Sequence, residues 1–331
     1  MGQYIMSNRE IALREWVNRQ LDYPEVKLIP LCGDASFRRY FRIYCDTHSY
    51  IVMDAPPEVE ALSPFIHTAN ILRACGVRVP EIHRVNQAMG FAVLEDFGDQ
   101  LLLNVLTQQN ADRQYSQAID ELLLIQNVLP ESILTFPEFN REFMQNEMML
   151  CIEWFIKQYL KYPLSTMQQS MLQNSFDIIS QQIAQQPQVL IHRDYHSRNI
   201  MCLQSEDGLK LGLIDFQDAM KGPYSYDLVS LYKDCYIEWP RENQLRWLRY
   251  YYERSPINQQ LSFHELVRDY DYCGLQRHLK VLGIFSRLYL RDGKDGYLKN
   301  VPLTLKYILN CLEVTGWLPE MFHFFQRIPL M

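Results

Sequence analysis

The chain has 331 residues, of which 48% are hydrophobic and 21% are charged, and it carries a formal net charge of -7 at pH 7. This length supplies enough core for one large or two medium domains, and the composition is that of an ordinary globular protein. The acidic balance argues against a general binder of nucleic acids or of anionic membranes.

The sequence indicates neither targeting nor membrane insertion. The first residues contain no apolar signal-peptide core, and no segment approaches the roughly 18 uninterrupted apolar residues of a membrane span. The eight cysteines are scattered singly and form no C-x-x-C pair, so we expect reduced thiols and no zinc or redox site. We therefore expect a soluble cytoplasmic protein.

The first third of the chain predicts a mixture of helices and strands. Apolar residues at helical spacing predict an amphipathic helix over 8–21. Two runs of aromatic and β-branched residues, 37–44 and 50–53, flank a polar turn and predict a β-hairpin. The remaining predicted elements of this part are a helix over 59–75, a strand after 77–80 and a short strand at 91–94.

Beyond residue 100 the pattern changes to long helices, which only the apolar strands between 189 and 215 interrupt. A strand-rich first third followed by a helical remainder predicts two lobes. We expect a mixed fold, α/β or α+β, with a small N-lobe over 1–98 and a large helical C-lobe over 99–331. The predicted helices after residue 100 are 100–129, 141–160, 166–186, 226–236, 241–254 and 264–291.

Two short segments carry the strongest functional signal. Residues 192–199 follow the pattern H-R-D-x-x-x-x-N, and Asp215 opens a D-F pair after a second apolar run. Their order and spacing are those of a kinase catalytic loop and its metal-binding aspartate, so we expect a bilobal protein-kinase-like fold. In this chemistry Asp194 accepts the proton of the attacking hydroxyl. Asn199 and Asp215 would bind Mg²⁺ against the phosphates of ATP, because hard oxygen donors suit this cation.

The side chains around this motif leave more than one role open. A buried structural aspartate is the alternative for Asp194. His192 is expected to brace the loop rather than to react, since a kinase needs no histidine nucleophile. His196 either contacts the substrate or is a solvated loop residue. Asp218 is either a third acid near the metal or a helix cap, and Asp227 either caps a predicted helix or braces the catalytic loop.

The N-lobe sequence departs from the expected nucleotide-binding pattern. A G-x-G-x-x-G loop would cover the phosphates, yet residues 31–42 contain one glycine. Met53 stands in the strand where a lysine would contact the phosphates. Another cation should therefore meet the nucleotide, and Arg38, Arg39 and Arg42 lie nearby in the sequence.

Strand alternation separates these three arginines. Arg39 lies on the apolar face of the predicted strand, whereas Arg38 and Arg42 share the other face. An arginine on an apolar face suggests a role, although an exposed edge strand would explain all three. Glu58 or Glu60, at the start of the next predicted helix, could pair with one of them as the C-helix glutamate of a kinase does.

These segments resemble the aminoglycoside phosphotransferase/choline kinase family of small-molecule kinases over nearly the whole chain. The resemblance rests on G-x-x-S-x-x-R-x-x-R at 33–42, the hinge Leu94-Glu95-Asp96, H-x-D-x-x-x-x-N at 192–199 and I-D-F-x-D at 214–218. The chain departs from this family at Arg193, where glycine is usual, and at Met53. A protein kinase is disfavoured, because the stretch between Phe216 and Pro223 has no room for an activation loop.

The resemblance also implies site residues and a substrate class. It implies that the nucleotide is bound by Ser36, Arg39, Arg42 and Glu95, and Arg38 is a further candidate as a nearby cation. Within the family, one bacterial subgroup looks most similar: kinases that use ATP to phosphorylate the C1 hydroxyl of N-acetylmuramate and/or N-acetylglucosamine in peptidoglycan recycling. The segments that carry this finer likeness are 33–42, 53–58, 94–99, 214–219 and 275–280.

A largely basic stripe would suit the lactyl carboxylate of muramate. Helical spacing places five residues on one side of the predicted helix 264–291: Arg277, Lys280, Ile284, Arg287 and Arg291. Arg277 and Lys280, together with His196 and Asp218, are therefore candidate substrate contacts. A solvated helix face would explain the stripe equally well. A site for polycationic aminoglycosides would need carboxylates instead.

Two other functions stay open at this stage. One is a kinase for an aminoglycoside, a choline-like amine or another alcohol. The other is a pseudokinase-like binding module, which the missing lysine and glycine loop suggest, although the joint presence of Asp194, Asn199 and Asp215 argues against it. We expect a monomeric enzyme with ATP and Mg²⁺ as cofactors, a small-molecule sugar as its partner, and no nucleic-acid or membrane partner.

Overall fold

The structure of this protein is a computed structural model that describes residues 7–31, 37–205 and 208–328. The chain forms two compact units. The strand-rich unit comprises Met1–Gln100 and Met201–Asp218, and the helical unit comprises Leu101–Ile200 and Ala219–Met331. The segment Met201–Asp218 thus belongs with the strands, although sequence order places it inside the expected C-lobe.

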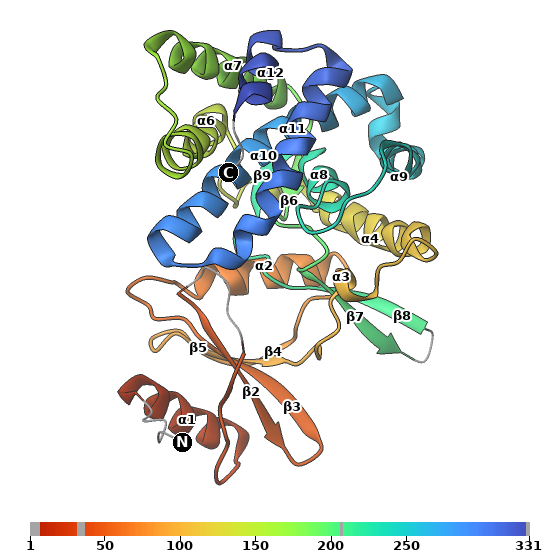
Figure 1. Ribbon diagram of the computed structural model, residues 1–331. Helices are drawn as coiled ribbons and strands as arrows, with labels where there is room; N and C mark the ends of the chain where they lie inside the picture. The colour runs from red at the N-terminus through yellow and green to blue at the C-terminus, as the bar shows by residue number, and fades with distance from the viewer. Residues whose placement is uncertain (1–6, 32–36, 206–207, 329–331) are drawn as a thin grey trace. The chain divides into compact units, whose positions relative to one another are not determined.

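The strand-rich unit contains a five-stranded antiparallel sheet with the order β1-β2-β3-β5-β4 (Figure 1). The predicted hairpin is present as β2 and β3, which pair from Arg39↔Asp54 to Cys45↔His48. Because β2 lies between β1 and β3, an exposed edge strand does not account for its arginines. The strands are β1 (Ile29–Pro30), β2 (Arg39–Cys45), β3 (His48–Asp54), β4 (Ile82–Asn86) and β5 (Phe91–Glu95).

Helix α1 (Asn8–Leu21) packs on this sheet and has the predicted span. A capping box starts it: Ser7 Oγ accepts a hydrogen bond from the Glu10 N–H, and the Glu10 carboxylate accepts one from the Ser7 N–H. Full burial of a large apolar side chain contributes about 1.5–3 kcal/mol, so this contact fixes α1 on the sheet. The buried residues shared by the helix and the sheet are Leu13, Trp16, Val17, Phe41, Ile43, Val52, Phe91 and Val93.

Two further elements complete the strand-rich unit. Helix α2 (Ser63–Ala74) lies within the predicted span 59–75, and β7 (Ile200–Ser205) pairs with β8 (Gly208–Leu213). Phe65 of α2 stacks on Phe216, with 4.9 Å between the ring centroids. The Leu213 N–H donates a hydrogen bond to the Arg78 carbonyl oxygen at 2.8 Å. These contacts hold the residues that follow β8, including Asp215, against the rest of the unit.

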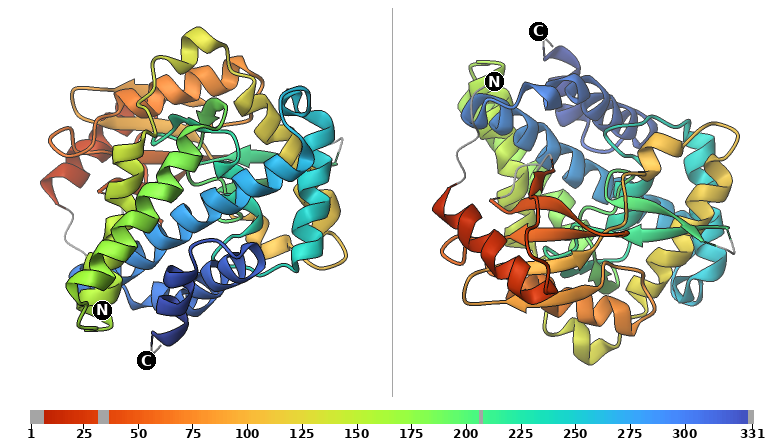
Figure 2. Two further views of the ribbon diagram at one scale, coloured as in Figure 1. Left: turned by 90° about the horizontal axis from the view of Figure 1, so that it is seen from above. Right: turned by 90° about the horizontal axis from the view of Figure 1, so that it is seen from below.

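The helical unit is organised around α10 (Phe263–Asp292), which packs against α6 and α7 on one side and α11 on the other (Figure 2). A side chain at Gly283 would not fit, because a Cβ there would lie 2.3 Å from the carbonyl carbon of Leu150. No described helix is long and apolar enough to cross a membrane. The other elements are α3 (Leu102–Val105), α4 (Ala111–Gln126), α5 (Pro130–Ile133), α6 (Arg141–Leu150), α7 (Thr166–Ala184), β6 (Gln188–Ile191), β9 (Met220–Pro223), α8 (Tyr226–Tyr232), α9 (Arg241–Arg254), α11 (Val301–Thr315) and α12 (Pro319–Arg327).

The helical unit differs from the sequence predictions in four places, one of which is that the predicted helix 226–236 ends at Tyr232 as α8. The predicted helix 100–129 is divided into α3 and α4, because the Asn110 side chain accepts a hydrogen bond from the Thr107 N–H at 2.8 Å and forms a turn. The predicted helix 141–160 continues beyond α6 as a π-helix, Cys151–Tyr159. Helices α11 and α12 were not predicted.

Candidate active site

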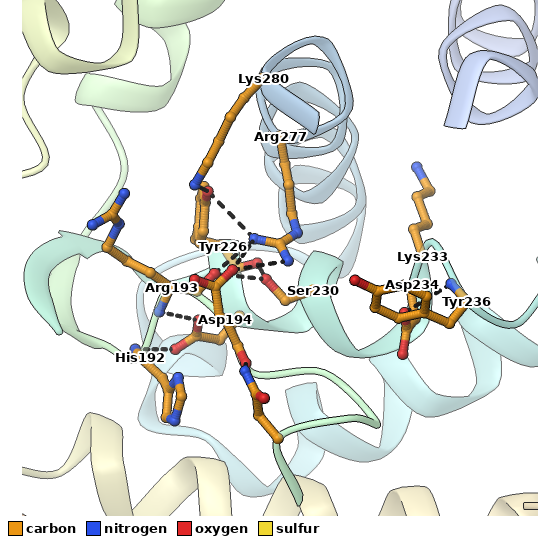
Figure 3. Close-up of polar contacts among 12 residues, drawn as sticks. His192, Arg193, Asp194, Tyr226, Ser230, Lys233, Asp234, Tyr236, Arg277 and Lys280 are labelled. Atoms are coloured by element: carbon orange, nitrogen blue, oxygen red, sulfur yellow. Dashed lines mark hydrogen bonds and ion pairs between the residues drawn. The ribbon is translucent and has the colours of Figure 1, made fainter. Parts of the chain in front are cut away.

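The catalytic loop, residues 192–199, follows strand β6 in the helical unit. Two hydrogen bonds fix its first residues: the carboxylate of Asp227 on α8 accepts from the N–H groups of His192 and Arg193 at 2.7 and 3.0 Å. Figure 3 shows these two residues side by side at the start of the loop. Asp227 is fully buried and Ser225 occupies the N-cap position of α8, so Asp227 braces the loop rather than caps the helix.

Arg193 has a left-handed backbone, with φ of 73°. This conformation costs roughly 1–2 kcal/mol for a residue with a Cβ, which explains why glycine suits the position and why arginine there needs support. Its carbonyl oxygen accepts a hydrogen bond from Arg277 Nη1 at 2.6 Å. Its guanidinium lies 2.8 Å from Glu147 Oε1 and over the ring of Phe143.

Asp194 lies beside two cations that project from α10 (Figure 3). Its Oδ1 is 3.4 Å from Arg277 Nη2, and its side chain is 38% exposed, so a hydroxyl group can reach the carboxylate. Burial raises the pKa of Asp194, but the charges of Lys280 and Arg277 outweigh it and hold the pKa well below its usual range. Asp194 is therefore ionised at neutral pH and can accept a proton.

Glu147 forms ion pairs with two cations next to this loop, Arg193 and Lys280. It is 9% exposed, and it lies 3.1 Å from Lys280 Nζ. Its other oxygen accepts a hydrogen bond from Gln276 Nε2 at 2.9 Å. Burial raises the pKa of Glu147, but the charges of Lys280 and Arg193 outweigh this effect and give a net lowering, so Glu147 is also ionised.

The candidate substrate residues on α10 are buried rather than solvated. Arg277 and Lys280 are each 5% exposed, and both approach the hydroxyl group of Tyr226, at 3.5 and 3.4 Å. A solvated helix face therefore does not describe these two residues. Further along the stripe, Arg291 is exposed and pairs with its neighbour Asp292.

The second half of the catalytic loop is held by Asp234. Its Oδ2 accepts hydrogen bonds from the backbone N–H, at 3.0 Å, and from the hydroxyl group of Ser197. The ring of His196 packs edge-on against Tyr236, with 5.5 Å between centroids, and burial lowers the pKa of His196. The Asn199 amide nitrogen donates to the carbonyl oxygen of Asp194 at 3.0 Å.

Asp215 lies in the strand-rich unit, directly after β8. It is exposed and adopts a left-handed backbone with φ of 64°, a strained conformation that is most common at functional sites. Gln217 Nε2 donates to Asp215 Oδ1 at 2.8 Å and approaches Asp218 Oδ2 at 3.4 Å. Burial raises the pKa of the Tyr40 hydroxyl group well above its usual range, and the negative charges of Asp215 and Asp218 raise it further. Both acids thus lie near Tyr40.

The three arginines of the N-lobe motif face different partners. Arg38, which is 7% exposed, pairs with Glu60 at 2.8 Å, so the glutamate pairing predicted for this region is confirmed. Arg38 and Glu60 also influence the hydroxyl group of Tyr40. Arg39 binds Glu10 and Asp54. Arg42 binds Asp96 of the hinge and Asp99 beyond it.

Three other residues bear on the nucleotide site: Met53, at the position of the missing lysine, and the candidates Glu95 and Ser36. Met53 is fully buried and pairs directly with Tyr40 across the β2–β3 ladder. Both carboxylate oxygens of Glu95 contact the guanidinium of Arg78. Ser36 lies outside the described residues.

Comparisons with known proteins identify the class. The chain matches the phosphotransferase enzyme family over residues 27–260. It is 36% identical to the N-acetylmuramate/N-acetylglucosamine kinase of Pseudomonas aeruginosa, over 93% of this chain and 90% of that one. It is 37% identical to the protein of the same name from Neisseria meningitidis, over 91% of this chain and 90% of that one.

Solved structures show the same fold at low sequence identity. Ethanolamine kinase from Plasmodium vivax matches with a TM-score of 0.63 and 12% identity, over 92% of this chain and 90% of that one. Choline kinase from Streptococcus pneumoniae matches with a TM-score of 0.63 and 14% identity, over 92% of this chain and 100% of that one. The chain belongs to the phosphotransferase enzyme family, and the predicted kinase-like fold and enzyme class are confirmed.

The sequence does not indicate Glu147 and Asp234 as partners of the catalytic loop. Both are buried polar residues, and neither belongs to a motif. The burial of Glu147 follows the helical spacing of α6, whose other buried residues are Met144 and Met148. A glutamate on the apolar side of an amphipathic helix is the one signal that could have found it.

Proposed function

We propose that this protein transfers the γ-phosphoryl group of ATP to the C1 hydroxyl of N-acetylmuramate and N-acetylglucosamine, and that it serves peptidoglycan recycling. The observation that carries the substrate class is the name shared by relatives that are 36% and 37% identical over more than nine-tenths of the chain. The solved kinases for amines share the fold at 12% and 14% identity, so they do not favour choline or ethanolamine here.

In this proposal Asp194 acts as the general base. The sugar hydroxyl donates a hydrogen bond to the exposed part of the carboxylate. The proton passes to Asp194 as the oxygen attacks the γ-phosphorus, the bond from that phosphorus to the bridging oxygen breaks, and ADP leaves. A hemiacetal hydroxyl is more acidic than an ordinary alcohol. The hydroxyl proton becomes strongly acidic as the oxygen bonds to phosphorus, so an ionised carboxylate can accept it, and the reaction needs no covalent phosphoenzyme.

The donor groups of two residues suit a magnesium ion by their chemistry. Asn199 and Asp215 offer an amide and a carboxylate oxygen, which are hard donors, and the Asn199 nitrogen is already directed to the Asp194 carbonyl oxygen. Mg²⁺ would supply positive charge to the phosphates. We propose that these two residues hold it, with Asp218 nearby as a third acid or as a substrate contact.

The other roles follow the division of the chain. We propose that the strand-rich unit, expected over 1–98 and extended by Met201–Asp218, binds the nucleotide, and that the rest of the predicted lobe 99–331 holds the catalytic loop and the substrate site. Ser36, Arg38, Arg39, Arg42 and Glu95 are proposed to serve the nucleotide. The proposed sugar contacts are His196, Asp218, Arg277 and Lys280. We further propose a cytoplasmic monomer without nucleic-acid or membrane partners.

One experiment tests the proposed function. The protein is incubated with ATP and Mg²⁺ and a panel of N-acetylmuramate, N-acetylglucosamine, kanamycin and choline, and the position of the phosphate is determined by phosphorus NMR. The proposal expects sugar 1-phosphates. Phosphorylation of kanamycin or choline in the absence of either sugar product would refute the substrate and leave the kinase chemistry in place.

A further inference from the structure

Glu147 is a buried acid with no role in the proton transfer or the metal binding proposed for this protein. It lies on α6, in the last turn before the π-helix Cys151–Tyr159, and its two oxygens contact Arg193, Lys280 and Gln276 at 2.8, 3.1 and 2.9 Å. π-helical turns are rare and are frequent at functional sites. A buried carboxylate with three charged or polar partners is well compensated, so its position is firmly set.

The contact with Arg193 has a consequence for the catalytic loop. Arg193 precedes Asp194, and its backbone is left-handed, which a residue with a Cβ adopts only with support. Asp227 and Arg277 hold the N–H and carbonyl groups of Arg193. Glu147 holds the far end of its side chain. The peptide that leads into Asp194 is thus anchored on both the backbone and the side chain.

We propose that Glu147 is a positioning residue for phosphoryl transfer: through its ion pair with Arg193 it stabilises the left-handed backbone that directs Asp194 toward the sugar hydroxyl. The inference rests on the proposed role of Asp194 as the base. Glu147 itself does not touch the substrate or the reacting atoms. Its effect should therefore be seen in kcat and in the order of the loop, while the KM values stay close to those of the parent.

A pair of substitutions at Arg193 separates positioning from a general loss of charge. Arg193→Gln and Arg193→Gly both remove the ion pair with Glu147. Only the glutamine variant keeps the Cβ and with it the left-handed strain, because glycine adopts this conformation freely. We expect kcat of the glutamine variant to be about tenfold below that of the glycine variant, which corresponds to ~1.4 kcal/mol.

The second arm changes Glu147 in two backgrounds. Glu147→Gln in the parent should lower kcat about tenfold, whereas the same change in Arg193→Gly should lower it less than about threefold, because the strain that Glu147 offsets is absent there. Glu153→Gln is the matched control: Glu153 also pairs with a lysine, Lys157 at 2.8 Å, but it lies in the first turn of the π-helix and both side chains are partly exposed. The control should behave as the parent does.

The measurements are kcat and KM for ATP and for N-acetylglucosamine, an uncharged sugar, together with amide hydrogen exchange of residues 192–199. Faster exchange in this loop for Glu147→Gln, but not for Glu153→Gln, is expected.

Equal losses from Glu147→Gln in both backgrounds, or a glycine variant as slow as the glutamine variant, would overturn the inference. If the parent phosphorylates no sugar, the proposed function fails, and the exchange comparison still decides the role of Glu147. If Glu147→Gln does not fold, the two Arg193 variants carry the test.

Discussion

Arg277 is bound both to the proposed base and to the peptide before it: its guanidinium lies 3.4 Å from Asp194 Oδ1 and donates to the Arg193 carbonyl oxygen at 2.6 Å. This side chain on α10 thus fixes the direction of the carboxylate, and together Lys280 and Arg277 hold the pKa of Asp194 low and keep it ionised. A carboxylate held in this way is a weak base. It suits an acidic hydroxyl group such as that of a hemiacetal better than an ordinary alcohol.

Replacement of the base gives the first prediction. Asp194→Asn keeps the size of the side chain and removes the proton acceptor, so kcat should fall by about 10²–10⁴-fold. Folding and nucleotide binding should persist, as measured by thermal unfolding and by calorimetric titration with ADP. Turnover within a few-fold of the parent would remove Asp194 from the role of base.

Loss of the candidate metal ligand should have a different signature. Asp215→Ala removes a hard oxygen donor, so the gain in ATP affinity on addition of Mg²⁺ should diminish, while ATP binding without Mg²⁺ should change little. Calorimetric titrations of ATP at several Mg²⁺ concentrations measure this directly. If the variant shows the Mg²⁺ dependence of the parent, Asp215 does not hold the metal.

The sequence predicted those parts of the site that are local in the chain. The spacing of Asp194 and Asn199 is a property of one loop, and the α1 span follows from apolar periodicity. The partners of the loop come from distant segments: Glu147 lies 46 residues before Arg193, and Arg277 lies 83 residues after Asp194. No local pattern specifies such pairings, because tertiary packing of α6 and α10 creates them.

The third prediction concerns the cation that meets the phosphates. Arg38 is buried, pairs with Glu60 and lies near Tyr40. The charges of Asp215 and Asp218 also raise the pKa of Tyr40. Arg38→Ala should therefore weaken ATP binding more than Arg39→Ala or Arg42→Ala does. The difference should be roughly 1.5–3 kcal/mol, the contribution of a charged hydrogen bond. Unchanged ATP dissociation constants in all three variants would refute the idea that an arginine replaces the lysine.

The fourth prediction is a pH dependence of stability. Glu121 on α4 is partly buried, and its Oε2 has no hydrogen-bond partner among the described residues. Burial, and to a lesser degree Asp120, raise the pKa of Glu121 from 4.5 to about 7. The folded protein then holds this proton more tightly than the unfolded chain does, so the contribution of Glu121 to stability is complete below pH 4.5 and is lost as pH rises through about 7.

Glu121→Gln should therefore stabilise the protein at pH 8 and have little effect at pH 4.5. The gain should be about 1 kcal/mol, since solvent screens this partly exposed side chain. Urea unfolding of the parent and the variant at both pH values measures it. Glu131→Gln, on the exposed surface of α5, is the control. A gain of the same size at both pH values would show that titration of Glu121 is not the cause.

The last prediction concerns how the site distinguishes its two proposed sugars. Lys280 lies 3.1 Å from Glu147 and near Tyr226, close to the carboxylate that is proposed to accept the sugar proton. If Lys280 also contacts the lactyl carboxylate of muramate, Lys280→Gln should reduce kcat/KM for N-acetylmuramate more than for N-acetylglucosamine. The difference should be roughly 1.5–3 kcal/mol. The loss that both sugars share reports the broken pair with Glu147, and only the difference between them reports the lactyl group.

Arg287→Gln, further along the same helix and only partly exposed, should affect both sugars alike. Equal losses on the two sugars in Lys280→Gln would separate Lys280 from carboxylate recognition and leave it with Glu147 as a support of the catalytic loop.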